Sequence, residues 1–199
     1  MQATAHFPIS RVSSQGSVGM RRATDLAFAF VVLGLFWWLL LAVWLAVKAD
    51  SKGPAIYRQE RVGRRNVRFT CYKFRTMFVG APLDASHRVD KGNVTRVGRI
   101  LRRLKLDELP QVINIIRGEM TLIGPRPCLP IQRELTRLRQ RKGIDSATPG
   151  ITGLAQINGI DMSDPLRLVE IEARYLRSVN FRLDMFILLR TFGIVRKVN

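Results

Sequence analysis

The sequence predicts an α/β fold that is mostly helical, has a few short strands and begins with a membrane helix. Three observations predict it. Leu26 to Val47 is apolar and contains no charged residue. Two short segments, 55–59 and 67–77, carry the β-branched and aromatic residues of strands. Later segments repeat apolar residues at helical spacing and are amphipathic: 95–104, 131–142, 163–178 and 181–198.

The composition limits what the chain can be. Its 199 residues suffice for one folded domain and an anchor, and 47% hydrophobic with 24% charged residues exclude a disordered chain and a multi-span membrane protein. Thirty-three Lys and Arg against 15 Asp and Glu give a net charge of +18. That charge requires an acidic partner, which is nucleic acid, anionic membrane lipid or a phosphorylated substrate. The cysteines and histidines are too isolated for a disulfide framework or a His-based metal site: Cys71, Cys128, His6 and His87.

The apolar run divides the chain into a flexible lead at 1–20, a membrane helix at 21–50 and a membrane-associated cytoplasmic domain at 51–199. As a helix, the run would extend about 33 Å, long enough to cross a bilayer core. Both flanks are basic, so the helix either spans the membrane or re-enters it, and the stronger C-terminal flank places the body in the cytoplasm. We expect these anchoring residues: Leu26, Phe36, Trp37, Trp38 and Trp44.

Two strands are predicted after the anchor, Ala55 to Gln59 and Val67 to Met77, with a turn at 63–66 between them. Lys73 and Arg75 would share one face of the second strand. They either bind an anion there or form an ordinary solvated face. A polar loop at 79–94 follows.

A short and very basic amphipathic helix is predicted at 95–104, where it lies on a membrane surface or faces a polyanion. Pro110 fits only the first turn of a helix, so the next helix should begin near Asp107 and end near Gly118. Asp107 and Glu108 would then lie at a helix N-terminus, whose dipole favours ionised carboxylates and whose N–H groups bind phosphate. Simple helix capping is the alternative for these two residues.

The segment 124–127, Gly-Pro-Arg-Pro, follows a predicted buried strand at 120–123. Two prolines fix the backbone around Arg126. A rigidly held guanidinium suits bidentate phosphate binding, and a turn with a surface arginine is the alternative.

Three helices complete the prediction. The first, 131–142, is basic and is capped by Gly143. The second begins with Ser163 as its N-cap and continues to about Ser178. The last, 181–198, is basic and amphipathic, and it lies either in a lipid headgroup plane or against the protein core.

Seven short motifs, taken together and in this order, resemble those of the bacterial sugar transferases, which are small monotopic polyprenyl-phosphate phosphoglycosyl transferases. The resemblance extends from about Met20 to the C-terminus. The motifs are Arg58–Gly63, Tyr72–Met77, Val94–Gly98, Leu106–Gln111, Gly118–Met120, Ile123–Pro127 and Pro149–Gln156.

The resemblance implies an enzyme of the bacterial inner membrane that transfers a sugar-1-phosphate from a UDP-sugar to polyprenyl phosphate, usually undecaprenyl phosphate. This is the first membrane step in assembling glycans such as lipopolysaccharide or exopolysaccharide. Asp107 would attack the β-phosphate, release UMP and carry the sugar-phosphate, while Glu108 would help to bind Mg²⁺. Lys73, Arg102 and Arg126 match basic family positions near the phosphates. Phosphoryl transfer depends on such positioning and charge neutralisation.

The sequence departs from the family pattern at three places. Trp37 and Trp38 stand where the family's apolar segment usually breaks at Ser-Pro, which leaves spanning and re-entrant paths both open. Ile160 and Asp161 replace an Arg-Asn pair of many members, and Glu172 replaces an aspartate. The last two departures leave the sugar open.

The main alternative is a membrane-tethered basic domain that binds nucleic acid or anionic lipid. No nucleic-acid fold signature is present and few aromatic residues lie among the basic runs, so we expect no nucleic-acid partner. Anionic lipid accounts for the charge at about 1 kcal/mol per basic residue near the headgroups. A catalytically inactive scaffold would not need the acidic pair and Arg126. The apolar helix face is also open to self-association as a homo-oligomer of unspecified number.

Overall fold

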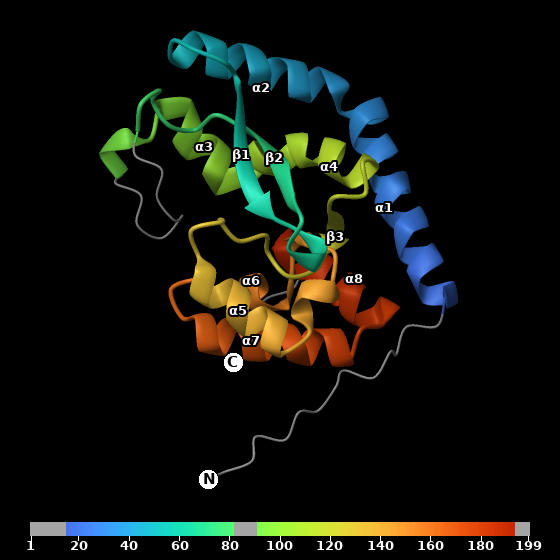
Figure 1. Cartoon of the computed structure of the whole chain (residues 1–199). Coiled ribbons are helices and arrows are strands. Elements are labelled where there is room, and N and C mark those ends of the chain that lie inside the picture. The colour runs from blue at the N-terminus through green and yellow to red at the C-terminus, as the bar shows by residue number, and fades with distance from the viewer. Residues whose placement is uncertain (1–14, 82–90, 194–199) are drawn as a thin grey trace.

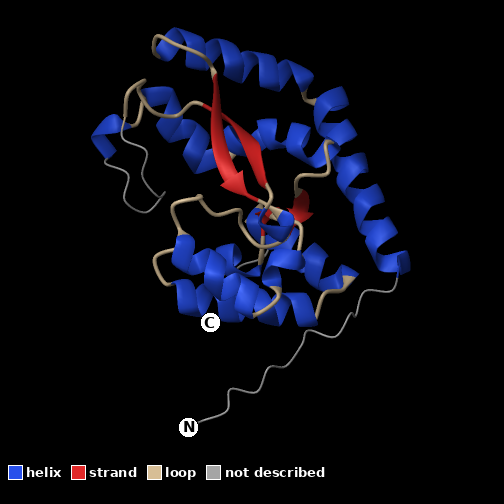
Figure 2. Ribbon diagram, in the orientation of Figure 1, coloured by secondary structure: helices blue, strands red, loops and turns tan. Residues whose placement is uncertain are grey.

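The computed structural model describes residues 15–81 and 91–193, which form a mostly helical α/β fold with a few short strands, as predicted (Figure 1, Figure 2). Two N-terminal helices lie along one edge, a β-hairpin crosses the centre, and the C-terminal helices gather at the opposite end (Figure 1). Most of the predicted lead, part of the 79–94 loop, and the end of the last predicted helix lie outside the described residues.

The longer elements follow one another in the chain as α1 (Gln15–Leu35), α2 (Trp37–Asp50), β1 (Ile56–Val62), β2 (Arg68–Phe74), α3 (Arg96–Leu104), α4 (Val112–Ile116), β3 (Thr121–Ile123), α5 (Arg133–Arg141), β4 (Gly150–Thr152), α6 (Leu154–Ile157), α7 (Pro165–Arg177) and α8 (Phe181–Thr191). Short 3₁₀ helices lie between them: η1 (Arg64–Asn66), η2 (Lys91–Asn93), η3 (Leu106–Gln111) and η4 (Ile144–Ser146).

The predicted membrane helix at 21–50 is a pair of helices, because the chain bends by 68° between α1 and α2. No single described helix is long and apolar enough to cross a bilayer, whereas 19–35 and 37–50 together meet that test of length and composition. At the bend, the indole N–H of Trp38 donates to the Leu35 carbonyl (2.9 Å). Residues 15–20, which were predicted to belong to the lead, are part of α1, which begins at Gln15.

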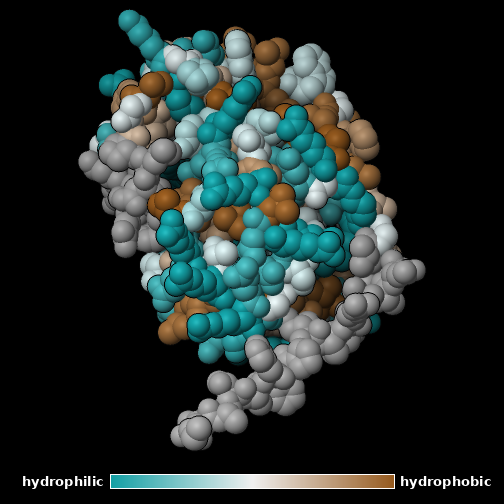
Figure 3. Space-filling view, in the orientation of Figure 1, coloured by the Kyte–Doolittle hydropathy of each residue, from teal (hydrophilic) through white to brown (hydrophobic). Residues whose placement is uncertain are grey.

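The helix pair turns its large side chains outward. The aromatic residues that we expected to anchor the chain are exposed, whereas Leu26 is half-buried: Phe36, Trp37, Trp38 and Trp44. Figure 3 shows hydrophobic side chains along the edge that the two helices form. Smaller side chains of the pair are buried against the body: Ala29, Val32, Val43 and Val47.

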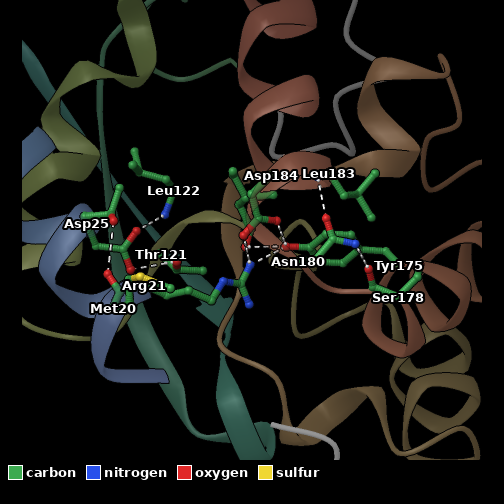
Figure 4. Close-up of polar contacts among 12 residues, drawn as sticks. Met20, Arg21, Asp25, Thr121, Leu122, Tyr175, Ser178, Asn180, Leu183 and Asp184 are labelled. Carbon is green, nitrogen blue, oxygen red and sulfur yellow. Dashed lines mark hydrogen bonds and ion pairs between the residues drawn. The ribbon is translucent and has the colours of Figure 1, made fainter. Parts of the chain in front are cut away.

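The N-terminal part of α1 is bound to the body by polar side chains (Figure 4). Arg21 donates to the Tyr175 hydroxyl of α7 and forms an ion pair with Asp184 of α8 (2.9 Å). Asp25 is buried and accepts the backbone N–H of Leu122 (2.9 Å) as well as a hydroxyl of β3. These contacts join three distant segments of the chain.

The hairpin of β1 and β2 is antiparallel and lies close to the predicted positions, with Lys73 opposite Tyr57. Phe69 and Cys71 are buried, as the alternation predicts. A second, parallel pair joins β3 to β4, with Thr121 opposite Gly150.

Lys73 and Arg75 do not form the common face that we predicted. Lys73 extends from β2 towards η3 and contacts Glu108. Arg75 lies past the end of β2, is buried, and donates to the carbonyls of Ser51 (2.6 Å) and Lys52 (3.0 Å). Arg75 therefore satisfies carbonyl groups at the end of α2 and holds that helix against the hairpin.

Gly98 allows α3 to pack directly on the backbone that follows β2. A Cβ at this position would lie 2.2 Å from the Thr76 carbonyl oxygen. Thr95 caps the helix by accepting the Gly98 N–H through its hydroxyl (3.0 Å). The helix is amphipathic as predicted, but Ile100 and Leu104 are exposed beside its arginines.

The helix predicted from Asp107 to Gly118 is instead η3 followed by α4. Lys105 adopts a left-handed conformation (φ 57°) that separates α3 from η3, and Pro110 lies within the tight turns of η3. Gly118 has a positive φ of 76° after the end of α4, as expected of a C-terminal glycine. The buried side chain of Asn114 accepts the Tyr72 N–H (3.1 Å) and so joins α4 to β2.

The C-terminal helices differ from the prediction at two ends. Asp164 rather than Ser163 caps α7, by accepting the Arg167 N–H (3.1 Å), since Pro165 occupies the first turn. Ser163 donates instead to Asp161. The last helix ends at Thr191, well before the predicted residue 198.

The described core lies mainly between α1, α4, β2 and β3, where fully buried residues include Ile115 and Met120. A second cluster fills the space between α5, α6 and α7. The 3₁₀ helix η3, which carries Asp107 and Glu108, packs beside the first cluster. The segment after β3, which carries Arg126, leads to the second cluster.

Candidate active site

Asp107 and Glu108 occupy the first turn of η3, directly after the left-handed Lys105. Both side chains are half-buried. A six-residue 3₁₀ helix replaces the longer helix whose dipole the sequence analysis invoked. Burial and the charges of neighbouring side chains therefore set the electrostatics of the two carboxylates.

Glu108 is the centre of an ion-pair network. Its Oε1 accepts a hydrogen bond from Lys73 Nζ of β2 (3.0 Å) and one from Arg126 Nη2 (2.6 Å). Burial raises the pKa of Glu108, but Arg126 and Lys73 lower it by more and hold it well below its usual range. The same contact raises the pKa of Arg126. Glu108 is thus ionised at neutral pH and fixes two of the predicted phosphate-binding cations.

Asp107 has a different environment from its neighbour. No described side chain donates a hydrogen bond to its carboxylate or forms an ion pair with it. Burial and then the nearby Glu108 raise the pKa of Asp107, while Lys73, Arg102 and Arg126 act in the opposite direction. A carboxylate that lacks hydrogen-bond donors but is surrounded by cations is poised for nucleophilic attack on a phosphate.

Arg102, the third predicted phosphate-binding residue, lies at the edge of this group. It extends from α3, is exposed, and donates from Nε to the Thr76 hydroxyl (2.9 Å). It influences Asp107 through charge and contacts neither carboxylate among the described interactions. The structure therefore brings Lys73 and Arg126 together on Glu108 and leaves Arg102 beside Asp107.

Two buried arginines hold the backbone of the loop 124–127, which presents Arg126. Arg61 of β1 donates to the Pro127 carbonyl (2.9 Å), and Arg139 of α5 donates to the Arg126 carbonyl (2.9 Å). Glu172 of α7 accepts two hydrogen bonds from Arg139 (2.9 and 2.5 Å). Burial lowers the pKa of Arg139, but Glu172 raises it by more, so the guanidinium remains charged.

Arg61 and Arg139 are not among the predicted site residues, although the sequence carries a signal for Arg139. Arg139 lies four residues after the buried Leu135, and Glu172 lies four residues after the buried Leu168. Both charged residues thus lie on the apolar faces of their helices. Because charged side chains are rarely buried unless they are paired, this placement indicates a buried ion pair.

Asp107 and Glu108 offer carboxylate oxygens that suit a metal ion such as Mg²⁺. Within 15–81 and 91–193, no three His, Cys, Asp or Glu side chains are grouped to bind one. Mg²⁺ commonly takes one or two carboxylates and completes its shell with water and substrate phosphates. Both cations contact Oε1 of Glu108, so Oε2 and the Asp107 carboxylate are the oxygens that fit this ion.

Comparisons with known proteins agree with the motifs. The family model described as Bacterial sugar transferase matches residues 16–198. The chain is 39% identical over 184 residues to an undecaprenyl-phosphate glucose phosphotransferase of Komagataeibacter xylinus, with 86% of this chain and 35% of that protein covered. It is 37% identical over 181 residues to a UDP-glucose:undecaprenyl-phosphate glucose-1-phosphate transferase of Caulobacter vibrioides, with 86% and 67% covered.

A third relative, from Aeromonas hydrophila, acts on a different sugar according to its name, UDP-N-acetylgalactosamine-undecaprenyl-phosphate N-acetylgalactosaminephosphotransferase. It is 34% identical over 186 residues, with 88% of this chain and 43% of that protein covered. The chain thus spans less than half the length of two of these relatives. The family match nevertheless includes the acidic pair, its cations and the Arg126 loop, and the chain belongs to the bacterial sugar transferase family.

Proposed function

We propose that this chain transfers a sugar-1-phosphate from a UDP-sugar to polyprenyl phosphate, through a covalent intermediate on Asp107, with release of UMP. The observation that carries the proposal is the contrast within the acidic pair. Glu108 is bound by two cations, whereas Asp107, one residue away, has no described donor and a raised pKa. The names of three relatives, which act on undecaprenyl phosphate with glucose or N-acetylgalactosamine derivatives, support the same reaction class.

In the first step, a carboxylate oxygen of Asp107 attacks the β-phosphorus of the UDP-sugar. The bond from that phosphorus to the bridging oxygen breaks, and UMP leaves with the bonding electron pair. Lys73 and Arg126 lie where they neutralise phosphate oxygens as charge develops. The product of this half-reaction is an acyl phosphate that links Asp107 to the sugar-phosphate.

In the second step, a phosphate oxygen of the polyprenyl phosphate attacks the same phosphorus. The bond to Asp107 breaks, the carboxylate is regenerated, and the sugar leaves on a diphosphate-linked lipid. Asp107 must therefore be ionised at the start of each cycle. The cations that oppose the effect of burial on its pKa serve this requirement.

Mg²⁺ is the cofactor that we propose for this site. Glu108 Oε2 and the Asp107 carboxylate would hold it together with substrate phosphates, and when bound it would supply charge neutralisation to the phosphoryl oxygens. Glu108 would then have two functions, because its Oε1 also positions Lys73 and Arg126.

We place the enzyme in the bacterial inner membrane with its site on the cytoplasmic face. The exposed aromatic residues of α2 and the exposed Ile100 and Leu104 of α3 are suited to lipid, and the arginines of α3 are suited to anionic headgroups. Asp107 follows α3 within a few residues, so this arrangement brings the acidic pair close to a lipid substrate. The product would begin the assembly of a cell-surface polysaccharide.

Nucleotide release tests the proposal. Purified protein in nanodiscs receives Mg²⁺, undecaprenyl phosphate and a panel of UDP-sugars. We expect one sugar to give UMP, Asp107→Asn to lower the rate on the order of 10³-fold or more, and the matched Asp145→Asn to retain it. A phosphorylated chain after reaction without the lipid would identify the intermediate. If no UDP-sugar gives UMP while the protein binds anionic liposomes or nucleic acid, the basic-tether alternative replaces the enzyme.

A further inference from the structure

Arg61 of β1 is a buried cation that forms no ion pair in the part of the chain that the structure describes. It is 6% exposed. Its Nη1 donates to the Pro127 carbonyl (2.9 Å), and its Nε and Nη2 donate to Gln59 Oε1 (3.1 and 2.6 Å). Both acceptors are neutral, and a guanidinium carries more N–H donors than these three bonds use. Because a buried charge is costly unless an opposite charge lies beside it, Arg61 lacks an anion.

Two further arginines are buried among the described residues, and the charge of each is compensated. Arg139 is paired with the Glu172 carboxylate (2.5 Å). Arg75 donates to the Ser51 carbonyl (2.6 Å) at the C-terminal end of α2, where the helix dipole is negative. Neither of them lines the large pocket beside the Arg126 loop, whereas Arg61 does.

That pocket has a volume of about 320 Å³ and lies between the Arg126 loop, α6 and α7. Both Arg61 and Arg126 line it. Of its two acidic lining residues, Glu172 is already paired with a buried arginine, and Asp161 accepts hydrogen bonds from Ser163. The pocket therefore brings two guanidinium groups to one cavity without a carboxylate between them.

The two guanidinium groups oppose each other electrostatically. Burial lowers the pKa of Arg61, and the charge of Arg126 lowers it further, while Glu108 acts in the opposite direction without contacting Arg61. An anion bound to both guanidinium groups would relieve this repulsion. A phosphate group suits the position, because it carries several acceptor oxygens and arginine binds it through two parallel hydrogen bonds.

We propose that Arg61 is a phosphate-binding residue, which forms with Arg126 a subsite for a phosphate monoester at this pocket. The proposal rests on the proposed function, which supplies two such groups in turn. UMP leaves in the first step, and polyprenyl phosphate enters in the second. Both are phosphate monoesters, so the same pair of guanidinium groups suits either of them.

A purely structural role is the competing explanation, since Arg61 also holds the Pro127 carbonyl. Gln59→Glu separates the two roles. It places a carboxylate oxygen where Oε1 now accepts two hydrogen bonds from Arg61. If Arg61 only holds the loop, this stronger partner leaves ligand binding unchanged. If Arg61 binds phosphate, the internal carboxylate neutralises the guanidinium and weakens the binding.

Equilibrium binding of UMP and uridine to the full chain in nanodiscs tests the proposal without catalysis. Gln59→Glu should weaken UMP binding about tenfold and leave uridine binding unchanged, because uridine lacks the phosphate. Its melting temperature should not fall, because both hydrogen bonds to Arg61 are kept. Gln140→Glu makes the same change of charge at an exposed position of α5 and should affect neither ligand.

Arg61→Gln is the second variant, and it removes the cation itself. It should also weaken UMP binding about tenfold and leave uridine binding unchanged. If this variant does not fold, Gln59→Glu decides the question alone. Binding of a short-chain polyprenyl phosphate to the same variants separates the two sources of phosphate. A loss for UMP alone assigns the subsite to the nucleotide, a loss for the polyprenyl phosphate alone assigns it to the acceptor, and a loss for both shows shared use.

Unchanged affinity for both phosphate monoesters in folded Gln59→Glu and Arg61→Gln would overturn the proposal and leave Arg61 a structural role. UMP release by the native protein keeps this result distinct from a failure of the proposed function. A native protein that releases UMP while the variants bind normally loses only the phosphate subsite. A native protein that releases no UMP, yet binds it through Arg61, loses only the catalytic proposal.

Discussion

The two halves of the candidate site are held by different means. The Arg126 loop is held through its backbone, since carbonyls of two consecutive residues each accept a hydrogen bond from a buried arginine. The acidic turn of η3 is held through side chains, since Glu108 is bound by Lys73 and Arg126 while Asp107 has no described donor. The Arg126 guanidinium is therefore fixed more firmly than the Asp107 carboxylate.

This difference suits a reaction with two phosphoryl transfers at one carboxylate. In the proposed mechanism Arg126 would face phosphate oxygens in both steps and would benefit from a rigid position. Asp107 would alternate between a free carboxylate and an acyl phosphate, and a side chain without fixed donors can do so without losing hydrogen bonds. The comparison predicts that breaking the Arg139–Glu172 pair behind Arg126 lowers stability as well as activity, whereas removing the charge of Lys73 beside Asp107 acts on the ionisation of Asp107 and on activity.

The largest expected effect on stability comes from breaking the pair behind Arg126. Arg139→Met leaves the Glu172 carboxylate buried without its partner, and we expect it to lower the free energy of unfolding by about 3–5 kcal/mol. The double variant Arg139→Met/Glu172→Leu removes both charges and should recover most of that loss. Urea denaturation followed by circular dichroism measures both.

A measurement of UMP release separates the effect of the Arg139–Glu172 pair on stability from its effect on catalysis. The double variant lacks the hydrogen bond to the Arg126 carbonyl, so its UMP release should stay reduced even though its stability returns. If the double variant were as unstable as Arg139→Met, or fully active, the loop would not depend on Arg139 in the way described.

A smaller loss of stability is expected from Gly98→Ala in α3, the helix that precedes Asp107. The added Cβ would meet the Thr76 carbonyl at 2.2 Å, so α3 must move away from the hairpin at a cost of about 1–3 kcal/mol. The movement would also separate Arg102 from the Thr76 hydroxyl. Gly19→Ala is the matched control, because nothing lies near that Cβ and alanine favours a helix by about 1 kcal/mol. Thermal unfolding should give opposite signs for the two variants.

The smallest expected effect is a shift in pH dependence. In the proposed mechanism Asp107 reacts as the carboxylate, so the rate should fall as the pH drops through its pKa, which burial and Glu108 raise above the ordinary aspartate value. Lys73 lowers that pKa, so Lys73→Met should move the acid limb of the rate profile to higher pH as well as slow the reaction. Lys52 is exposed and is not among the residues that influence the pKa of Asp107, so Lys52→Met should leave the acid limb in place. A shift to lower pH in Lys73→Met would contradict the assignment of the limb to Asp107.

The sequence predicted the parts of the site that depend on short motifs. Lys73 and Arg126 contact Glu108, the family is confirmed, and the catalytic and phosphate-binding roles of these residues stay predictions. Local patterns could not show that the helix at Asp107 would be replaced by a 3₁₀ helix. That outcome depends on the left-handed Lys105, a residue type that rarely adopts this conformation.

Most of the features that the sequence did not predict depend on contacts between residues that are far apart in the chain. Arg61 looks like a surface residue in a chain with a net charge of +18, and it donates to a backbone carbonyl in a distant loop. The helical spacing of Arg139 indicated burial, but it could not show that this side chain also donates to a carbonyl of that loop. The bend between α1 and α2 was left open because Trp37 and Trp38 replace Ser-Pro. The structure bends there nonetheless, and the Trp38 indole satisfies a carbonyl at the bend.

The polar contacts at the start of α1 have a consequence for how the protein is assembled. Asp25 accepts a backbone N–H of β3, and Arg21 joins the ends of α7 and α8. The N-terminal helix is thus a structural part of the folded body, and its sequence is not interchangeable with that of another apolar helix. A chimaera that carries a foreign apolar helix over 19–35 would keep the hydrophobicity of the segment, yet it would leave the Leu122 N–H without its acceptor and lose the cooperativity of its unfolding transition.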